Sequence, residues 1–140
     1  NGLYKYSLEN ISENITKPKL FIESISVNYK KIKILNTKTI ELAPNENNIA
    51  IRFKTINLKQ VAKTTYRYKL NDTYSPWKYN NSIEFANLKS GKYQFLVQSK
   101  NGTQLSNEVV FNFNIDKPIY QKTWFYILIC VSIVSNIFLL

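Results

Sequence analysis

The side chains that could do chemistry in this sequence are few and scattered. It contains no histidine, which excludes a histidine-based triad, a histidine general base and an ordinary histidine zinc site within the chain. The 9 acidic residues are spread out without the paired spacing that acid–base catalysis needs. The lone Cys130 lies inside an apolar run, so it offers neither a disulfide nor an accessible thiolate. The residues therefore predict no enzyme, no metal site and no cofactor.

The charge balance raises a different class of partner. With 19 basic and 9 acidic residues the formal net charge is +10, which is typical of proteins that bind nucleic acid or an anionic surface. The lysines, however, are spread singly along the expected strands, where they also protect strand edges from aggregation. Arg52 and Arg67 are the two arginines, and bidentate recognition of phosphate or base edges favours arginine. We therefore expect solvated faces and no nucleic-acid binding by this segment.

The elements that position these residues are short and alternating. Ile49, Ile51 and Phe53 share one face of a strand, whereas Ile56 and Leu58 change the phase, which predicts a bulge near residue 55. Similar patterns predict strands at residues 20–27, 31–35, 39–42, 48–58, 65–70, 82–85, 91–100 and 108–115. This spacing favours an all-β fold, an immunoglobulin/fibronectin-III-like antiparallel β-sandwich, with an open barrel as the alternative.

One tyrosine stands out as an anchor of that sandwich. Leu88 and Gly91 precede the alternating run of Tyr93, Phe95 and Val97, which indicates a tight turn that delivers Tyr93 onto a half-buried strand. This pattern is typical of a tyrosine corner, in which the phenol bonds to the backbone a few residues upstream. A core tyrosine on another kind of sheet is the alternative. The Asn101-Gly102 pair after the strand predicts a hairpin.

The last eighteen residues, 123–140, carry no charge. As a helix they would span about 27 Å, just short of the roughly 30 Å hydrocarbon core, so we expect a transmembrane helix cut at its far end, with a buried core helix as the alternative. Tyr120, Trp124 and Tyr126 would lie at the membrane interface. Ser132 and Asn136 are four residues apart and share one face, which predicts a contact between helices and a homodimer. The connector before the helix has one proline and no glycine, so it is not a flexible tether.

Three blocks of this sequence resemble a known family. The first is the strand with Tyr66, Tyr68 and Leu70, followed by Trp77; the second is the run from Leu88 to Val97 around Tyr93; the third is Pro118, Tyr120 and the aromatic residues 124–126. Together they resemble the triple-tyrosine domain of two-component-regulator propeller sensors, over residues 20 to about 126. The first six residues are similar to the last strand of a propeller blade, with a frayed terminus as the alternative.

The resemblance implies a domain order and a function. Residues 1–16 would be the end of an upstream module, the last propeller strand, with its linker. Residues 17–117 would form the sandwich, and residues 118–140 would form the juxtamembrane segment and the transmembrane helix. The implied function is an extracytoplasmic signal-relay or spacer domain of a bacterial histidine kinase, in which a β-propeller senses the ligand and a cytoplasmic domain gives the output. The sandwich would then be periplasmic, and the protein a single-pass inner-membrane protein.

Two alternative functions stay open at this point. One is the same sensor with a helix-turn-helix transcription output. The other is a membrane-anchored module that binds a glycan or a peptide through exposed rings such as Tyr74 and Tyr79, with an adhesin stalk as a weaker variant.

Overall fold

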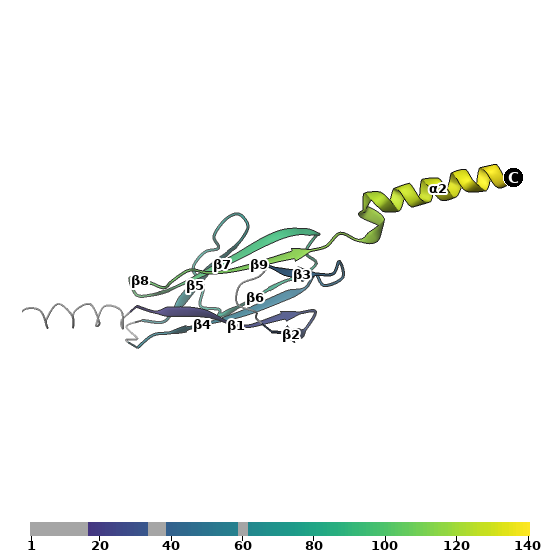
Figure 1. Ribbon diagram of the computed structural model, residues 1–140. Coiled ribbons are helices and arrows are strands. Elements are labelled where there is room, and N and C mark those ends of the chain that lie inside the picture. Colours follow the sequence, from purple (N-terminus) through teal and green to yellow (C-terminus); the bar gives the residue numbers. More distant parts are fainter. Residues whose placement is uncertain (1–16, 34–38, 59–61) are drawn as a thin grey trace, which may run out of the picture.

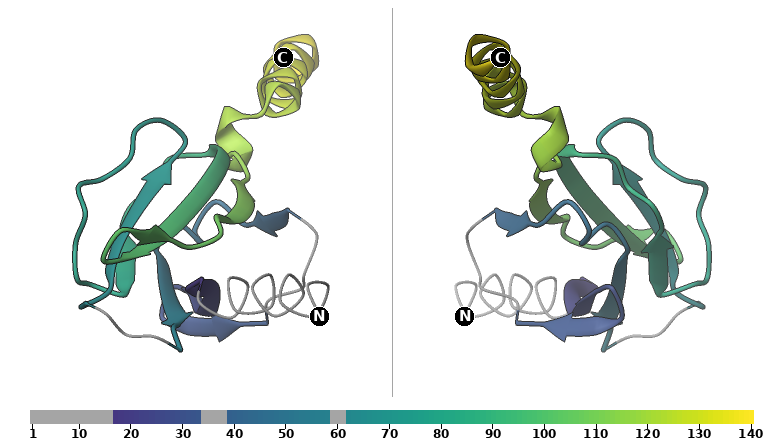
Figure 2. Two further views of the ribbon diagram at one scale, coloured as in Figure 1. Left: turned by 90° about the vertical axis from the view of Figure 1, so that its left-hand side faces the viewer. Right: turned by 90° about the vertical axis from the view of Figure 1, so that its right-hand side faces the viewer.

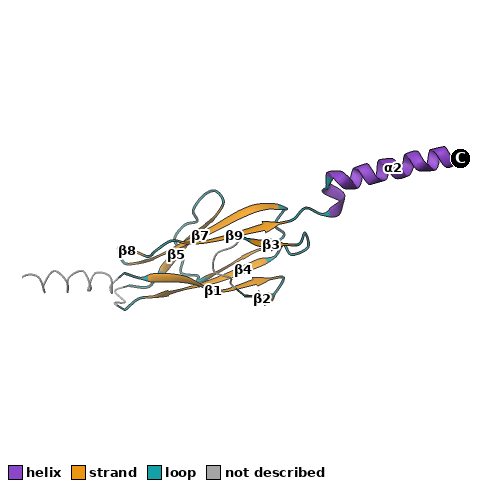
Figure 3. Ribbon diagram, in the orientation of Figure 1, coloured by secondary structure: helices purple, strands orange, loops and turns teal. Residues whose placement is uncertain are grey.

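The computed structural model describes residues 17–33, 39–58 and 62–140 of the chain (Figures 1 and 3). The predicted propeller strand and linker within residues 1–16 lie outside these described residues. The elements are β1 (Lys19–Val27), β2 (Lys30–Ile32), β3 (Ile40–Leu42), β4 (Ile49–Ile56), β5 (Thr65–Leu70), β6 (Ser82–Phe85), β7 (Gly91–Asn101), β8 (Gln104–Leu105), β9 (Val109–Ile115), a 3₁₀ turn (Ile119–Gln121) and α2 (Thr123–Leu139).

The strands form two sheets that pack face to face (Figure 2). One sheet has the order β2-β1-β4-β6, and the other has the order β3-β9-β7-β5 with β8 paired to β7. The prediction of a β-sandwich is therefore confirmed. The expectation that it is purely antiparallel is wrong, because β3 runs parallel to β9. A short strand on the outer edge can take either direction, since its sequence specifies only which side chains face the core.

The alternating patterns place one face of each long strand in the core. Ile49, Ile51 and Phe53 of β4 are buried, and so are Phe111 and Phe113 of β9. Aromatic rings dominate the centre: the ring centroids of Phe53 and Phe95 are 6.5 Å apart across the two sheets. The fully buried phenylalanines and their aliphatic neighbours therefore hold the sheets together, as the burial of apolar surface demands.

The predicted bulge near residue 55 is wrong. Strand β4 keeps its phase, so Thr55 points inward and its Oγ1 donates a hydrogen bond of 2.8 Å to Ser99 Oγ in the other sheet. Ile56 and Leu58 are left outside, 52% and 73% exposed. The irregularity lies instead in β1, between Ile22 and Ser24. The Thr55 hydroxyl can face inward because Ser99 satisfies its hydrogen bond. Strand β4 therefore keeps its alternation, although Ile56 and Leu58 are out of phase with the apolar residues before them.

Two turns follow from local sequence. Asn28 and Tyr29 adopt φ values of 47° and 68°, which allows the two-residue turn between β1 and β2. The hairpin after β7 is present, but Asn101 pairs with Gln104, so the turn residues are Gly102 and Thr103. Gly102 has φ of 60°, a conformation that glycine adopts without a Cβ penalty.

The C-terminal helix α2 projects away from the sandwich (Figure 1), and it contains no buried residue. Its 17 residues span about 26 Å at the usual helical rise. Among the described residues no helix is both long and apolar enough to cross a membrane, so the predicted transmembrane helix is not supported. The alternative of a buried core helix is also wrong, because α2 packs on neither sheet.

Candidate functional site

The first tyrosine block lies on β5 and faces the core. Tyr66 is 8% exposed, and its ring centroid lies 5.0 Å from that of Phe53. Tyr68 stacks on Phe95 at 6.1 Å, and Leu70 packs against the same core. These side chains come inward because β5 alternates, which leaves the intervening Arg67 and Lys69 on the opposite side. The block therefore builds the sandwich and leaves its outer face basic.

Tyr93 of the second block makes the bond that a tyrosine corner requires. Its hydroxyl donates to the carbonyl oxygen of Lys89 at 2.6 Å, and its ring stacks on Phe113 at 5.1 Å. The preceding turn contains Asn87 with φ of 53° and Gly91 with φ of 153°, both in the region that favours short or absent side chains. Leu88 packs against the core between them. The Tyr93 hydroxyl bond and the packing of Leu88 therefore both hold the turn before β7 in place.

Trp77 and Tyr74 lie on the outer side of β5, away from the core. The segment that carries them runs along the edge of β5, where Tyr66 N donates to Lys78 O at 2.7 Å and Lys78 N donates back to Tyr66 O at 2.8 Å. Arg67 lies against both rings, with its Cζ 4.2 Å from the centroid of Tyr74 and 4.8 Å from that of Trp77. The arginine therefore joins the edge segment to the sheet by cation–π contacts.

The two rings that could have stacked on a glycan differ in their surroundings. Tyr74 is half-buried, and its hydroxyl donates to Glu108 Oε1 at 3.1 Å. Burial and this bond to a carboxylate raise the pKa of Tyr74 above its ordinary value. Tyr79 is 62% exposed, and Lys63 Nζ lies 4.6 Å from its centroid. Tyr74 is thus part of the folded surface, whereas Tyr79 alone keeps the exposure that ring stacking needs.

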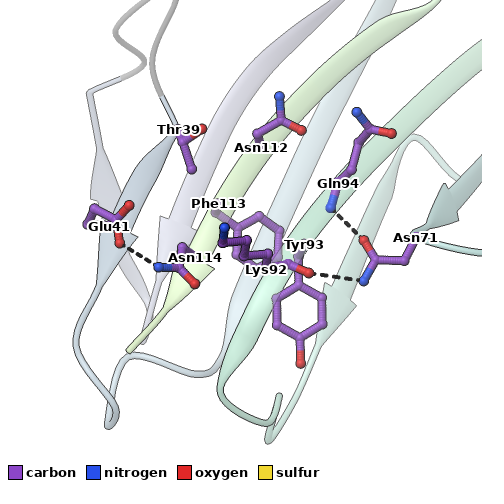
Figure 4. A pocket seen from close by; sticks show the side chains of 9 residues that line it. All are labelled: Thr39, Glu41, Asn71, Lys92, Tyr93, Gln94, Asn112, Phe113 and Asn114. Atoms are coloured by element: carbon purple, nitrogen blue, oxygen red, sulfur yellow. Dashed lines mark hydrogen bonds between the residues drawn. The ribbon is translucent and has the colours of Figure 1, made fainter. Parts of the chain in front are cut away.

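A hollow of about 500 Å³ lies on the outer face of the five-stranded sheet (Figure 4). Asn71, with φ of 65°, extends β5 by one residue: its Oδ1 accepts from Gln94 N at 2.7 Å and its Nδ2 donates to Lys92 O at 3.2 Å. On the other side, Asn114 Nδ2 donates to Glu41 Oε2 at 2.8 Å. Amide side chains therefore frame the hollow and keep its walls in place.

The connector between β9 and α2 is held by several bonds. Asp116 N donates to Leu42 O at 2.9 Å, and the Asp116 carboxylate accepts from Lys122 Nζ at 3.0 Å and from Lys117 N at 2.8 Å. The Lys122 side chain, followed by the Lys117 amide, lowers the pKa of Asp116 below its ordinary value. Pro118 begins the 3₁₀ turn with φ of −56°. The chain between sheet and helix is thus braced rather than free.

The predicted membrane-interface and helix-contact residues lie on this connector and on α2. Tyr120, Trp124 and Tyr126 are all exposed. Asn136 Nδ2 donates to Ser132 O, one turn earlier in the same helix, at 2.8 Å. The structure therefore brings Ser132 and Asn136 together on one face, and the roles assigned to both sets of residues stay predictions.

Sequence reasoning missed the Arg67 contacts and the Asp116–Lys122 ion pair. An arginine between two tyrosines was a possible signal for the first, because arginine often stacks on aromatic faces. The second joins residues six apart outside a helix, a spacing that no local rule marks. Across residues 17–33, 39–58 and 62–140, no three His, Cys, Asp or Glu side chains form a group that could hold a metal.

Solved structures with the same fold are parts of much larger proteins. The extracellular domain of BT3049 from B. thetaiotaomicron, described as a hybrid two component system, is 22% identical with a TM-score of 0.63, over 76% of this chain and 16% of that one. The extracellular domain of BT4673 is 19% identical with a TM-score of 0.61, over 73% of this chain and 16% of that one. BT4673 is described as a one component system in one structure and as a hybrid two component system in another. This chain thus spans about a sixth of their length.

The sequence comparisons match part of the chain to one family. No curated protein matches the chain. Residues 62–116 match the family model of the Y_Y_Y domain, and this segment contains both tyrosine blocks, from β5 through β9. Over residues 62–116 this chain is therefore similar to the Y_Y_Y domain family.

Proposed function

We infer that this chain is an extracytoplasmic domain of a bacterial sensor protein, which relays a signal from an upstream ligand-sensing module to its C-terminal helix. The Y_Y_Y match supports this function, and so does a fold that occurs in extracellular domains of two component systems. The upstream module would be a β-propeller, and a cytoplasmic domain, a histidine kinase or a transcription regulator, would give the output. The periplasm is the compartment that fits such a domain. The segment itself would contribute no catalysis.

The braced connector is the observation that carries the relay. The inner face of β9 lies in the core, and its last residue, Ile115, is buried. The backbone N–H of the next residue, Asp116, donates to Leu42 O of β3. The Asp116–Lys122 ion pair then ties the end of the sheet to the residue before α2. A short connector with internal bonds transmits rotation or displacement of the sandwich to the helix, whereas a flexible one would absorb it.

The test is an insertion in the full-length receptor that carries this domain. We expect Gly-Ser-Gly-Ser placed after Lys117 to leave surface expression intact and to abolish ligand-dependent output in cells, because the inserted residues absorb the displacement as chain disorder. The matched control is the same insertion after Thr103, in the exposed β7–β8 turn. A full response with the insertion after Lys117 would make the sandwich a passive spacer and end the relay proposal.

The sensor would act as a homodimer. The exposed face of α2 with Ser132 and Asn136 offers polar groups to a second copy, and these two residues already lie one helical turn apart. Two-fold symmetric dimers are the commonest soluble homo-oligomers, and a two-fold contact uses the same patch on both copies.

A further inference from the structure

The outer face of the five-stranded sheet combines cations, rings and unpaired amides. We define this outer face by Arg67 and Lys69 of β5, Lys100 and Gln94 of β7, and Asn112 of β9. In the strand register Gln94 lies opposite Asn112, Arg67 opposite Gln98 and Lys69 opposite Leu96, so the two amides are direct neighbours and the cations lie further along the same face. All five alternate with core residues, so they point away from the other sheet.

Aromatic rings hold the cations of the outer face in place. Lys69 Nζ lies 4.9 Å from the centroid of Tyr74, and Lys100 Nζ lies 5.7 Å from that of Trp77. Arg67 lies against both rings, and its Nε and Nη2 donate to Gln98 Oε1 at 3.1 and 2.7 Å. A ring contact uses one side of an ammonium group, which has three donors, and leaves the others directed to solvent.

Their charge is not neutralised within the described part of the chain. The ion pair found there joins Lys122 to Asp116, on the connector, and none involves Arg67, Lys69 or Lys100. Glu108 accepts the hydrogen bond of the Tyr74 hydroxyl, whose ring lies against Arg67. Gln98, the partner of Arg67, is neutral. The outer face therefore presents fixed positive charge that a negatively charged ligand would complement.

Amides continue the face beyond the cations. Gln94 and Asn112 are exposed, form a cross-strand pair and point in the same direction beside the hollow (Figure 4). Within residues 17–33, 39–58 and 62–140 their side chains take part in no hydrogen bond, although the backbone N–H of Gln94 donates to Asn71 Oδ1. Each amide offers two donors and an acceptor to neighbouring hydroxyl groups.

We propose that the outer face binds an anionic saccharide chain, with its carboxylate or sulfate groups at Lys69, Arg67 and Lys100 and its hydroxyls at Gln94 and Asn112. The cations favour an anion, and the two open amides on the same face favour a ligand that also carries hydroxyl groups. A peptide that adds as a strand needs a free sheet edge, but the edge of β5 is already bonded to the segment at Lys78. An acidic peptide held through its side chains is the other possible ligand, and poly-glutamate tests it. This inference goes beyond the relay function and does not depend on it.

Titration of the 140-residue chain with saccharides tests the proposal, with the protein kept in a non-ionic detergent at moderate salt. Polygalacturonate supplies carboxylates, dextran sulfate supplies sulfates, and dextran supplies neither. We expect one or both anionic chains to bind and dextran not to bind. The double variant Lys69→Gln with Lys100→Gln should weaken that binding about tenfold or more, because charge-assisted hydrogen bonds are lost. The tighter of the two anionic chains identifies the acidic group.

Two controls separate site-specific binding from general charge. Lys31→Gln with Lys54→Gln removes the same charge from exposed positions of the other sheet and should change the affinity no more than about twofold. Gln94→Ala with Asn112→Ala should weaken saccharide binding and leave binding of poly-glutamate unchanged. An equal loss of saccharide affinity in the two double lysine variants would overturn the proposal. So would poly-glutamate binding as tightly as the saccharides, or no binding of either anionic saccharide.

Discussion

At the residue scale, the tyrosines of this domain have different tasks. Tyr66 and Tyr68 supply ring area to the core, Tyr93 fixes a turn through its hydroxyl, and Tyr74 packs against Arg67 outside the sheet. The difference follows from the position of each ring in its strand or loop. A tyrosine offers an apolar body and one polar tip, so its surroundings decide which of the two matters.

Replacing Tyr93 by phenylalanine should destabilise the domain by about 1 kcal/mol, because one net hydrogen bond is lost while ring packing on Phe113 is kept. The bond to Lys89 is solvent-exposed, which favours this modest figure over a larger one. The measurement is the midpoint of chemical denaturation. Tyr79→Phe is the matched control, since Tyr79 is 62% exposed and should tolerate the change. Identical midpoints for the two variants would mean that the corner bond does not stabilise the turn.

At the element scale, the connector differs most from what its composition suggests. Seven residues with a single proline predict stiffness, but the structure shows that stiffness comes also from bonds: Asp116 to β3 on one side and to Lys122 on the other. The 3₁₀ turn between them adds Gln121 N to Pro118 O at 2.9 Å. An exposed ion pair alone is worth little, so the connector depends on the combination.

The connector should loosen at low pH. Because the pKa of Asp116 is lowered below 3.8 in the folded chain, its contribution to stability is present above pH 3.8 and is lost as the pH falls through the lower value. NMR amide shifts of Ile119 to Lys122 should therefore move over that range. In Asp116→Asn the same amides should already have the low-pH shifts at neutral pH and should not titrate. If wild type and variant show the same pH profile, Asp116 is not the group that braces the connector.

At the scale of the whole molecule, a closed sandwich carries an exposed helix. The sandwich buries its own core between the sheets, whereas α2 has no buried residue and leaves its apolar side chains open. An exposed apolar surface of this extent marks a contact with something else. A second copy of the chain is the contact that the proposed sensor dimer would supply.

Asn136→Leu should weaken self-association of the chain in detergent micelles by on the order of 0.6 to 2 kcal/mol, because a polar contact between apolar helices is lost. Sedimentation equilibrium measures the change. Ile137→Leu is the control, since it alters an exposed apolar position next to Asn136 without touching its amide. Association that is unaltered in Asn136→Leu would exclude this face from the contact.

Alternation in the sequence is enough to predict which side chains face the core. Alternation in β4, β5 and β9 specified their inward residues, and the spacing around Tyr93 specified the corner, because side-chain direction along a strand has a fixed period of two. The two tyrosine blocks were enough to indicate the family. Local turn chemistry at Asn28 and Tyr29 was also readable, since few residues tolerate positive φ.

Tertiary structure alone decided how these elements meet. The parallel direction of β3, the inward bond of Thr55 and the placement of Arg67 between two rings all depend on segments distant in the chain. Local patterns do not predict such contacts, because the sequence around an outward cation or a short edge strand does not specify which distant segment it will contact. The helix shows the same limit: its uncharged run predicted a membrane span, but its 17 residues form no helix long and apolar enough to cross one. Local periodicity specifies the face of a residue, and only the folded chain supplies its partner.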